Sequence, residues 1–461
     1  MDSSRVGSGS LWPARHLDRV PRIAIRGIIS IHVTKDKRKH GGHRMKGETG
    51  KRISDHATIK RKNRLSILRQ IRENGPLSRV ALKKWTRLSW GTVTSSIREL
   101  LGKGILTETG SVASGLGRRP VEIDLNTAKN QVLGIHLGGS LVRAVLVDVK
   151  GAVVDSQELS LRTNGSSHEI LGRMLKVARE LLKRRSLQPR SLGGIGIAAP
   201  GAVDFQSGVC LYAPHHPNLI DVPLRETFEQ AFGIPCFVDH VSNCYALSEK
   251  LFGLGKGLDN FICVLLGTGV SAGIVIGGEV YRGIECFSGE FGHTCINENG
   301  PLCVCGNKGC IEAYASGPAI ARAALEMGSP SDSVLALAGG DPTRITAETL
   351  CRAAALKDAR AVRVFRRMGV HLGVGISNLI NVFNPQCIIL GGAVSRASSH
   401  FLPSLLRTIS TRAWHASTKD VRVSTLESGA ECGAAAMVLQ QLFTTGRILR
   451  GTRSSLQESS T

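Results

Sequence analysis

Four side chains in one short segment have the types and the spacing of metal ligands. The segment GEFGHTCINENGPLCVCGNKGCIEAYAS holds His293, Cys303, Cys305 and Cys310, in the pattern His-x9-Cys-x-Cys-x4-Cys. Three thiolates and one imidazole saturate a tetrahedral Zn²⁺ and leave no position for a substrate. The pattern therefore predicts a structural zinc ion, and the alternative is three reduced cysteines in a loop.

Two glutamates, Glu290 and Glu312, flank this cluster. Carboxylates held near one rigid point can accept hydrogen bonds from several sugar hydroxyls. They predict a sugar pocket beside the metal, although two exposed surface glutamates would be equally compatible with the spacing alone.

Glycine pairs mark three turns that follow apolar strands. Gly138-Gly139 joins the strands of the hairpin 132–154, Gly267-Thr268-Gly269 follows NFICVLL, and Gly391-Gly392 follows CIIL. Any tight hairpin needs glycine, so each turn alone is a weak signal. The first two turns stand at the start of two halves, each with predicted strands followed by helices. They predict phosphate loops in a duplicated α/β fold with a cleft between two lobes.

The positive charge is concentrated near the N-terminus. The chain of 461 residues has a formal net charge of +23, and residues 1–126 hold 27 Lys and Arg against 10 Asp and Glu, a net of +17. Such a basic segment ahead of a nearly neutral body predicts contact with nucleic acid. We expect residues 1–60 to be a disordered basic extension and residues 446–461 a disordered tail.

Residues 61–126 have the pattern of a winged helix-turn-helix. A helical pattern begins at Arg61, with Leu65, Leu68 and Ile71 on one face, and ends at Gly75-Pro76. Ser78 and Ser89 have the positions of N-caps for a second and a third helix. The stretches GILTETG and RRPVEIDL then predict two strands joined by a basic hairpin. A small helical bundle for protein contacts is the alternative interpretation.

The third helix has an apolar face and a polar face. Val93, Ile97, Leu100 and Leu101 form the apolar face. The opposite face suits a DNA groove, and Arg118 and Arg119 at the hairpin tip could reach phosphates. The predicted DNA-binding residues are Ser89, Trp90, Thr94, Ser95, Arg98, Arg118 and Arg119.

Other classes of protein are disfavoured by composition. No run of eighteen apolar residues is present, so no membrane partner is expected. Nine of the twelve cysteines stand singly in apolar segments, which is unlike a secreted disulfide framework and favours the reducing cytoplasm.

These features occur together in one family. Over about residues 60–440 the chain resembles the ROK family of bacterial repressors, open reading frames and sugar kinases, in its regulator subgroup. The resemblance rests on GRRP, GIAAPGAVD, GTG, GEFGH, CVCGNKGCIE and NPQCIILGGAV, of which the cysteine motif is specific. It implies a winged helix-turn-helix followed by a two-lobed actin-like ATPase body over residues 127–445. It also implies zinc on the four ligands above and sugar contacts from Glu290, His293 and Glu312.

The departures from the kinases of that family bear on activity. His136, in HLGGS, stands where they carry an aspartate in the first phosphate loop. In VDHVSN, His240 and Val241 replace the Asn-Asp of their NDAN motif, whose aspartate is the base, and Asn243 keeps the last position. Val241 has no group that accepts a proton. Asp239 is adjacent, but strand alternation would point it to the opposite face.

We therefore expect no catalytic residue, and vestigial phosphate loops at Gly138, Gly139, Gly267, Thr268 and Gly269. His240 and Asn243 are expected to join the sugar contacts. The predicted function is a sugar-responsive transcriptional regulator, expected to repress genes of carbohydrate metabolism, with xylose metabolism as one example. Its partners would be a double-stranded DNA operator, a sugar or sugar phosphate, and further copies of itself in a homodimer or larger assembly. The alternatives are an ATP-dependent sugar kinase of the hexokinase or glucokinase type, and a DNA-binding protein without an effector.

Overall fold

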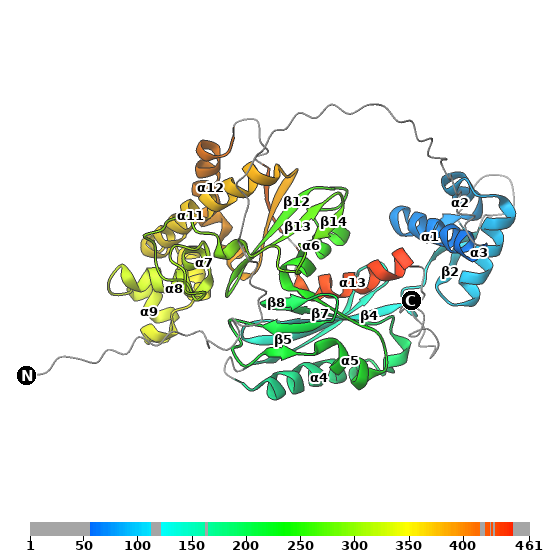
Figure 1. The fold of residues 1–461 in the computed structure, drawn as a ribbon, viewed down its shortest axis with the longest axis horizontal. Coiled ribbons are helices and arrows are strands. Elements are labelled where there is room, and N and C mark those ends of the chain that lie inside the picture. The colour runs from blue at the N-terminus through cyan, green and yellow to red at the C-terminus, as the bar shows by residue number, and fades with distance from the viewer. Residues whose placement is uncertain are drawn as a thin grey trace, which may run out of the picture. The chain divides into compact units, whose positions relative to one another are not determined.

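The structure is a computed structural model, which describes residues 56–111, 121–161, 165–414, 420–424, 426 and 429–445 (Figure 1). The predictions for residues 1–55, for the hairpin tip at 112–120 and for the tail at 446–461 lie outside the described residues.

The N-terminal region contains three helices and a small antiparallel sheet. Its elements are α1 (His56–Asn74), β1 (Leu77–Ser78), α2 (Arg79–Thr86), α3 (Trp90–Gly102), β2 (Leu106–Ser111) and β3 (Val121–Leu125), with strand order β1-β3-β2. Both predicted N-caps are present, because Ser78 accepts a hydrogen bond from the Ala81 amide and Ser89 from the Thr92 amide, each at 3.2 Å.

Two details of α1 differ from the sequence-based expectation. The helix begins at His56, five residues before Arg61 and inside the expected disordered extension, and its Lys60 Nζ lies 3.2 Å from Glu99 Oε2 of α3. Leu65 is only half-buried, and Ile67 is buried with Leu68 and Ile71 instead. The buried positions follow the 3.6-residue helical period more closely than a three-residue spacing does.

The first lobe is built on a five-stranded sheet of order β11-β7-β4-β5-β6. Helices α4 and α5 cover one face of this sheet (Figure 1). The elements are β4 (Gln131–Leu137), β5 (Leu141–Asp148), β6 (Val153–Ser160), α4 (Ser167–Arg184), β7 (Ile195–Ala199), β8 (Ala202–Asp204), β9 (Val209–Tyr212), β10 (Ile220–Val222), α5 (Leu224–Phe232) and β11 (Cys236–His240).

The second lobe repeats this plan, with a sheet of order β14-β13-β12-β15-β16. In both sheets three antiparallel strands are followed by two parallel ones, which confirms the predicted duplication. The elements are α6 (Val241–Phe252), β12 (Phe261–Leu266), β13 (Val270–Ile276), β14 (Glu279–Tyr281), α7 (Glu312–Ala315), α8 (Gly317–Glu326), α9 (Asp332–Leu337), α10 (Ala347–Ala355), α11 (Ala359–Phe383), β15 (Cys387–Gly391), α12 (Ser398–Arg412) and β16 (Val421–Val423).

The last helix, α13 (Ala430–Thr445), returns to the first lobe and packs on β4 and β7. A Cβ at Gly134 of β4 or at Gly196 of β7 would collide with the α13 backbone, so the close approach requires glycine at both positions. On its other side α13 packs against α6, which lies on the sheet of the second lobe. These two helices therefore form the packed layer between the lobes.

The N-terminal region and the first lobe share one hydrophobic core. It includes Ile67 and Leu82 of the N-terminal region, Val145 of β5, and Val438 of α13. The Arg72 guanidinium of α1 lies 4.7 Å from the centre of the Phe443 ring of α13. Asn130 donates a hydrogen bond to the Gly104 carbonyl at 3.0 Å. Helix α13 thus contacts both the first lobe and α1.

Candidate functional site

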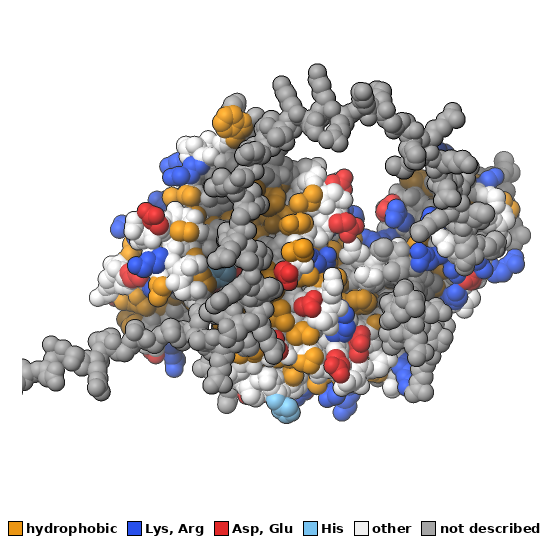
Figure 2. Space-filling model, viewed as in Figure 1, with side chains coloured by type: hydrophobic (Ala, Val, Ile, Leu, Met, Phe, Trp, Pro, Cys, Tyr) orange, Lys and Arg blue, Asp and Glu red, His pale blue; other side chains and the backbone are white. Residues whose placement is uncertain are grey.

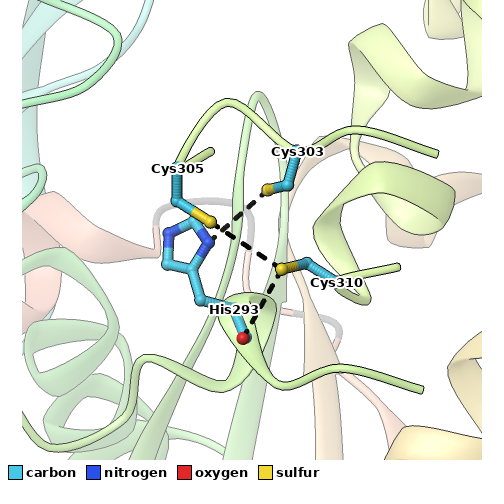
Figure 3. A group of neighbouring side chains, drawn as sticks. All are labelled: His293, Cys303, Cys305 and Cys310. Atoms are coloured by element: carbon cyan, nitrogen blue, oxygen red, sulfur yellow. Dashed lines mark hydrogen bonds between the residues drawn. The ribbon is translucent and has the colours of Figure 1, made fainter. Parts of the chain in front are cut away.

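The four predicted metal ligands come together at one point (Figure 3). His293 ends the short 3-10 helix η3 (Phe291–His293), and the three cysteines precede α7. The four ligand atoms lie within 4.8 Å of one another, with 3.6 Å from Cys303 Sγ to His293 Nδ1 and 3.7 Å between the sulfurs of Cys305 and Cys310.

This arrangement fits a tetrahedral metal ion. With metal–sulfur bonds of about 2.3 Å, the edges of a tetrahedron of ligands measure about 3.8 Å. Burial and then the Cys303 side chain raise the pKa of the Cys310 thiol, so the thiols need a nearby cation to ionise together. None of the twelve cysteines forms a disulfide.

Carboxylates and imidazoles gather beside the metal ligands. Glu290 Oε2 lies 3.8 Å from His293 Nε2, the ring nitrogen opposite the one that faces Cys303. Glu312 is buried at the start of α7 and accepts a hydrogen bond from the Val270 amide at 2.8 Å. We call Glu290, Glu312, His293, His240 and His215 the carboxylate–imidazole cluster.

His215 is a member of this cluster that sequence reasoning missed. A Cβ at Gly269 would lie 2.7 Å from Glu312 Oε2 and 3.1 Å from His215 Nε2, so both side chains approach the same glycine. Burial lowers the pKa of His215, and the Glu312 carboxylate opposes that shift. Because His215 follows β9 of the first lobe and Glu312 belongs to the second, the contact spans the two lobes. No spacing in the sequence relates these residues.

His240, which the resemblance matches to the kinase motif, is the last residue of β11. Its Nδ1 lies 2.7 Å from the Ser242 hydroxyl, and burial lowers its pKa while Glu290 and Asp239 oppose the shift. Asn243 is buried and donates to Asp239 at 2.9 Å, so its amide nitrogen has a partner inside the protein.

Asp239 is held by an arginine of the other lobe. Its Oδ2 accepts Arg282 Nε at 2.9 Å and Nη2 at 2.8 Å, and the same guanidinium lies 4.1 Å from the centre of the Phe205 ring. Asn243 donates to the other oxygen, Oδ1, so both oxygens of this buried carboxylate have partners inside the protein. Val241, the next residue but one, begins α6 and has no proton-accepting group.

The two predicted phosphate loops contact each other. A Cβ at Gly139 would lie 2.8 Å from the Thr268 methyl group, so the first loop fits against the second only as glycine. Two backbone amides are already used, since Gly138 donates to Leu141 at 2.9 Å and Gly267 to Gly269 at 2.9 Å. The buried His216 bonds the Gly138 carbonyl through Nε2 at 2.8 Å.

His136, where the resemblance places the aspartate of a kinase, faces a carboxylate of the last helix. Its Nδ1 lies 3.7 Å from Glu431 Oε2, and Arg143 Nη1 lies 3.4 Å from Glu431 Oε1. Burial lowers the pKa of His136. Helix α13 therefore contacts β4 at one end and α1 near its other end.

The predicted DNA-contacting face of α3 is largely exposed. Ser89, Trp90, Ser95 and Arg98 are exposed, whereas the Thr94 hydroxyl is covered and has no hydrogen-bond partner. Lys and Arg side chains are spread over the region of α1–α3 (Figure 2). Four further exposed residues were not among the predicted DNA contacts. They lie on α2 and the following turn, at Lys83, Lys84, Trp85 and Arg87. Arg118 and Arg119 lie outside the described residues.

Among the described helices, none has the length and apolar character needed to cross a membrane.

Known proteins match most of the chain. The model of the ROK family matches residues 132–441. The xylose repressor of Bacillus subtilis (strain 168) is 31% identical over 363 residues, which cover 78% of this chain and 90% of that protein. A crystal structure of a ROK family transcriptional regulator, a homologue of the E. coli MLC protein, has a TM-score of 0.71 at 31% identity and covers 84% of this chain and 97% of that one.

A kinase structure matches a smaller share of the chain. The ROK family glucokinase from Streptomyces griseus, in complex with glucose and AMPPNP, has a TM-score of 0.61 at 29% identity and covers 68% of this chain and 99% of its own. The regulator match therefore extends over more of the chain than the kinase match does.

Proposed function

Because the chain belongs to the ROK family, we propose that it is a DNA-binding transcriptional regulator that responds to a sugar and represses genes of carbohydrate metabolism. One observation carries the proposal: the likeness to a ROK transcriptional regulator covers 84% of the chain, against 68% for a glucokinase. The name of the Bacillus subtilis relative, a xylose repressor, supports repression and a sugar effector.

The DNA reader in this proposal is a winged helix-turn-helix over residues 61–126. Helices α2 and α3 with the turn between them would form the helix-turn-helix, and β2 and β3 the base of the wing. The exposed residues Ser89, Trp90, Ser95 and Arg98 would enter the major groove. Lys83, Lys84 and Arg87 would reach phosphates beside it.

The body in this proposal binds a sugar without phosphorylating it. The missing base at Val241 and the pairing of Asp239 with Arg282 support this reading. The alternative, an ATP-dependent sugar kinase, predicts turnover on the order of 1 s⁻¹ or faster with ATP, Mg²⁺ and a panel of aldoses. We expect no phosphorylation above background, and such a turnover would refute the proposal.

Zinc in this proposal is structural. His293, Cys303, Cys305 and Cys310 would hold the ion and thereby fix the loop that carries Glu290 and the start of α7 with Glu312. Three thiolates and a neutral imidazole around Zn²⁺ leave a formal charge of −1. The filled coordination shell would stabilise the loop and leave no position for a substrate.

The protein would act in the cytoplasm as at least a homodimer. Two DNA-binding regions must match half-sites about one helical turn apart, so a modest rotation between them weakens both contacts. Closure of the two lobes on the sugar would move the N-terminal region, which packs on the first lobe.

The test is an operator titration with the full-length protein. A duplex selected from a random library would be titrated with and without a sugar identified by thermal shift. We expect the sugar to change operator affinity roughly 5- to 150-fold, the range of typical couplings. A protein that selects no duplex sequence would refute the regulator, and a bound sugar that leaves the operator isotherm unchanged would refute the response.

A further inference from the structure

The exposed face of α3 carries two side chains that have no partner among the described residues. Trp90 is 48% exposed at the start of the helix, and Arg98 is exposed about two turns later. The hydroxyl groups on this face are used within the helix. Those of Ser89 and Thr92 bond to each other at 2.8 Å, and Ser95 donates to the Thr92 carbonyl at 3.2 Å. Of the exposed side chains that the structure describes on α3, only Trp90 and Arg98 therefore lack a hydrogen bond or ion pair.

These two side chains suit different base pairs. The Arg98 guanidinium carries only donors, which match the two acceptors on the major-groove edge of guanine. The Trp90 ring is mostly apolar, and thymine presents a methyl group in the major groove, as no other base of DNA does. Exposed cations at Lys83, Lys84 and Arg87 precede the helix, so the surface attracts a polyanion. An exposed aromatic ring beside such cations is placed to contact an apolar group of DNA.

Gly91, next to Trp90, is not required by the fold. A Cβ at this position would contact no other part of the protein within 4 Å, and its φ is not positive. Glycine makes a helix less stable than alanine does, because it loses more conformational freedom on folding. A glycine that neither packing nor backbone conformation needs suits a place where another molecule approaches the backbone closely.

We propose that the Trp90 ring packs on the methyl group of one thymine in each operator half-site, and that Gly91 is a positioning residue that lets the first turn of α3 approach the DNA. This inference rests on the proposed DNA-binding function and names a base that the operator contains. Trp90 and Arg98 are eight positions apart in the sequence, which is about 12 Å along a helix. Base pairs are about 3.4 Å apart, so in a helix that follows the groove the two side chains reach base pairs roughly three to four steps apart.

The first experiment replaces thymine with uracil, which removes only the methyl group. The full-length protein would be titrated with the duplex selected from a random library, and with duplexes in which each thymine of one half-site is replaced in turn. We expect one replacement to lower the affinity roughly 4-fold, the value for losing one buried methyl-sized group. A selected operator in which no replacement changes the affinity overturns this inference and leaves the regulator intact.

Variants of the protein assign the methyl group to Trp90. In Trp90→Ala the thymine and uracil duplexes should bind with equal affinity, whereas Trp90→Phe keeps an apolar ring and should still prefer thymine. Trp85→Ala is the matched control, because Trp85 is 54% exposed on α2 and should not affect the difference between the two duplexes. If Trp90→Ala weakens both duplexes by the same factor, Trp90 contacts the DNA backbone and the inference is overturned.

Gly91→Ala separates DNA binding from stability. The melting temperature should stay unchanged or rise, since alanine favours the helix. The operator affinity should fall at least about 4-fold, because the added methyl group holds the Trp90 ring away from the thymine. Gly102→Ala is the control, since a Cβ at this last residue of α3 also contacts nothing, and it should bind the operator like the wild type.

Two results distinguish failure of this inference from failure of the proposed function. A Gly91→Ala variant with wild-type operator affinity, or with a lower melting temperature, overturns the positioning role of Gly91. If the wild-type protein selects no duplex sequence at all, the proposed regulator fails, and the contact between Trp90 and thymine fails with it.

Discussion

Individual ion pairs decide which side chains are free for chemistry. Asp239 lies two residues before Val241, where the resemblance predicts the base of a kinase, and Arg282 and Asn243 occupy both of its oxygens. His136 belongs to β4, ahead of the first predicted phosphate loop, and its ring faces Glu431 of α13. In both places a titratable group that could serve a kinase is paired inside the protein, which favours binding over turnover.

The zinc site can be tested by replacing one ligand. Cys305→Ser should reduce the zinc content from about one ion per chain to near zero and lower the thermal stability, because a structural ion contributes to folding. The control is Cys295→Ser, since this exposed cysteine lies in the same loop outside the cluster. The measurement is elemental analysis with thermal unfolding. Full zinc content in Cys305→Ser would exclude the four-ligand site.

A second prediction concerns pH and His240. Burial lowers the pKa of this histidine in the folded state, so the unfolded chain binds a proton more readily. The stability that it contributes is fully present above the ordinary value of about 6.5 and is lost as the pH falls below it, by up to about 1.4 kcal/mol per pH unit. The free energy of unfolding, measured with urea at pH 7.5 and at pH 5.5, should differ less between the two pH values in His240→Gln than in the wild type. His168→Gln, an exposed histidine of α4, should keep the wild-type difference.

Among the elements, α3 shows how packing fixes the orientation of a short helix. Ser89 caps it, and Val93, Ile97 and Leu100 bury one face against α1 and α2. The opposite face remains exposed at Trp90, Ser95 and Arg98. The apolar contacts fix the rotation of the helix about its axis, and that rotation decides which side chains are exposed.

Arg98 should therefore contribute to sequence recognition. We expect Arg98→Ala to weaken binding to the selected operator by about 1–3 kcal/mol while changing non-specific binding less, as for a contact to a base edge. Lys84→Ala should weaken operator binding and non-specific binding by similar factors. It should also reduce the dependence of DNA affinity on salt concentration by the amount expected for the loss of about one phosphate contact. Titrations on operator and random duplexes at several salt concentrations distinguish the two. If Arg98→Ala loses the same amount of affinity for both duplexes, Arg98 contacts a phosphate and not a base.

The features that could be predicted from the sequence are those set by residues close together in the chain. The metal ligands lie within 18 residues of one another, and the helix caps and glycine turns depend on adjacent residues. The contacts of Arg282 with Asp239, His215 with Glu312, and α13 with β4 join residues from 43 to almost 300 positions apart, which no periodicity relates. The covered hydroxyl of Thr94 could not be foreseen either, because helical spacing alone places it on the exposed face.

At the scale of the whole molecule, α13 is an element that contacts both lobes and the N-terminal region. Glu431 contacts His136 and Arg143 of the first lobe, and Phe443 contacts Arg72 of α1. A shift of this helix on lobe closure would move both contacts together, which is a physical route for coupling.

Two variants should interrupt the coupling at different points. Arg72→Ala removes the contact with Phe443, so sugar should still bind while its effect on operator affinity falls below about 5-fold. Glu312→Ala should abolish sugar binding and leave sugar-free operator binding unchanged. Arg69→Ala, at an exposed position of α1, is the control. The measurement is the operator affinity of each variant with and without sugar. If sugar changes the operator affinity of Arg72→Ala as much as that of the wild type, coupling through α13 is excluded.

The return of α13 to the first lobe has a consequence for synthesis on the ribosome. Strands β4 and β7 are complete by residue 199, but the helix that covers their second face begins at residue 430. While the second lobe is being made, the nascent chain therefore exposes an apolar sheet face that nothing yet covers. Exposed faces of this kind make folding intermediates prone to aggregation. We therefore expect the first lobe to finish folding only after α13 has been synthesised.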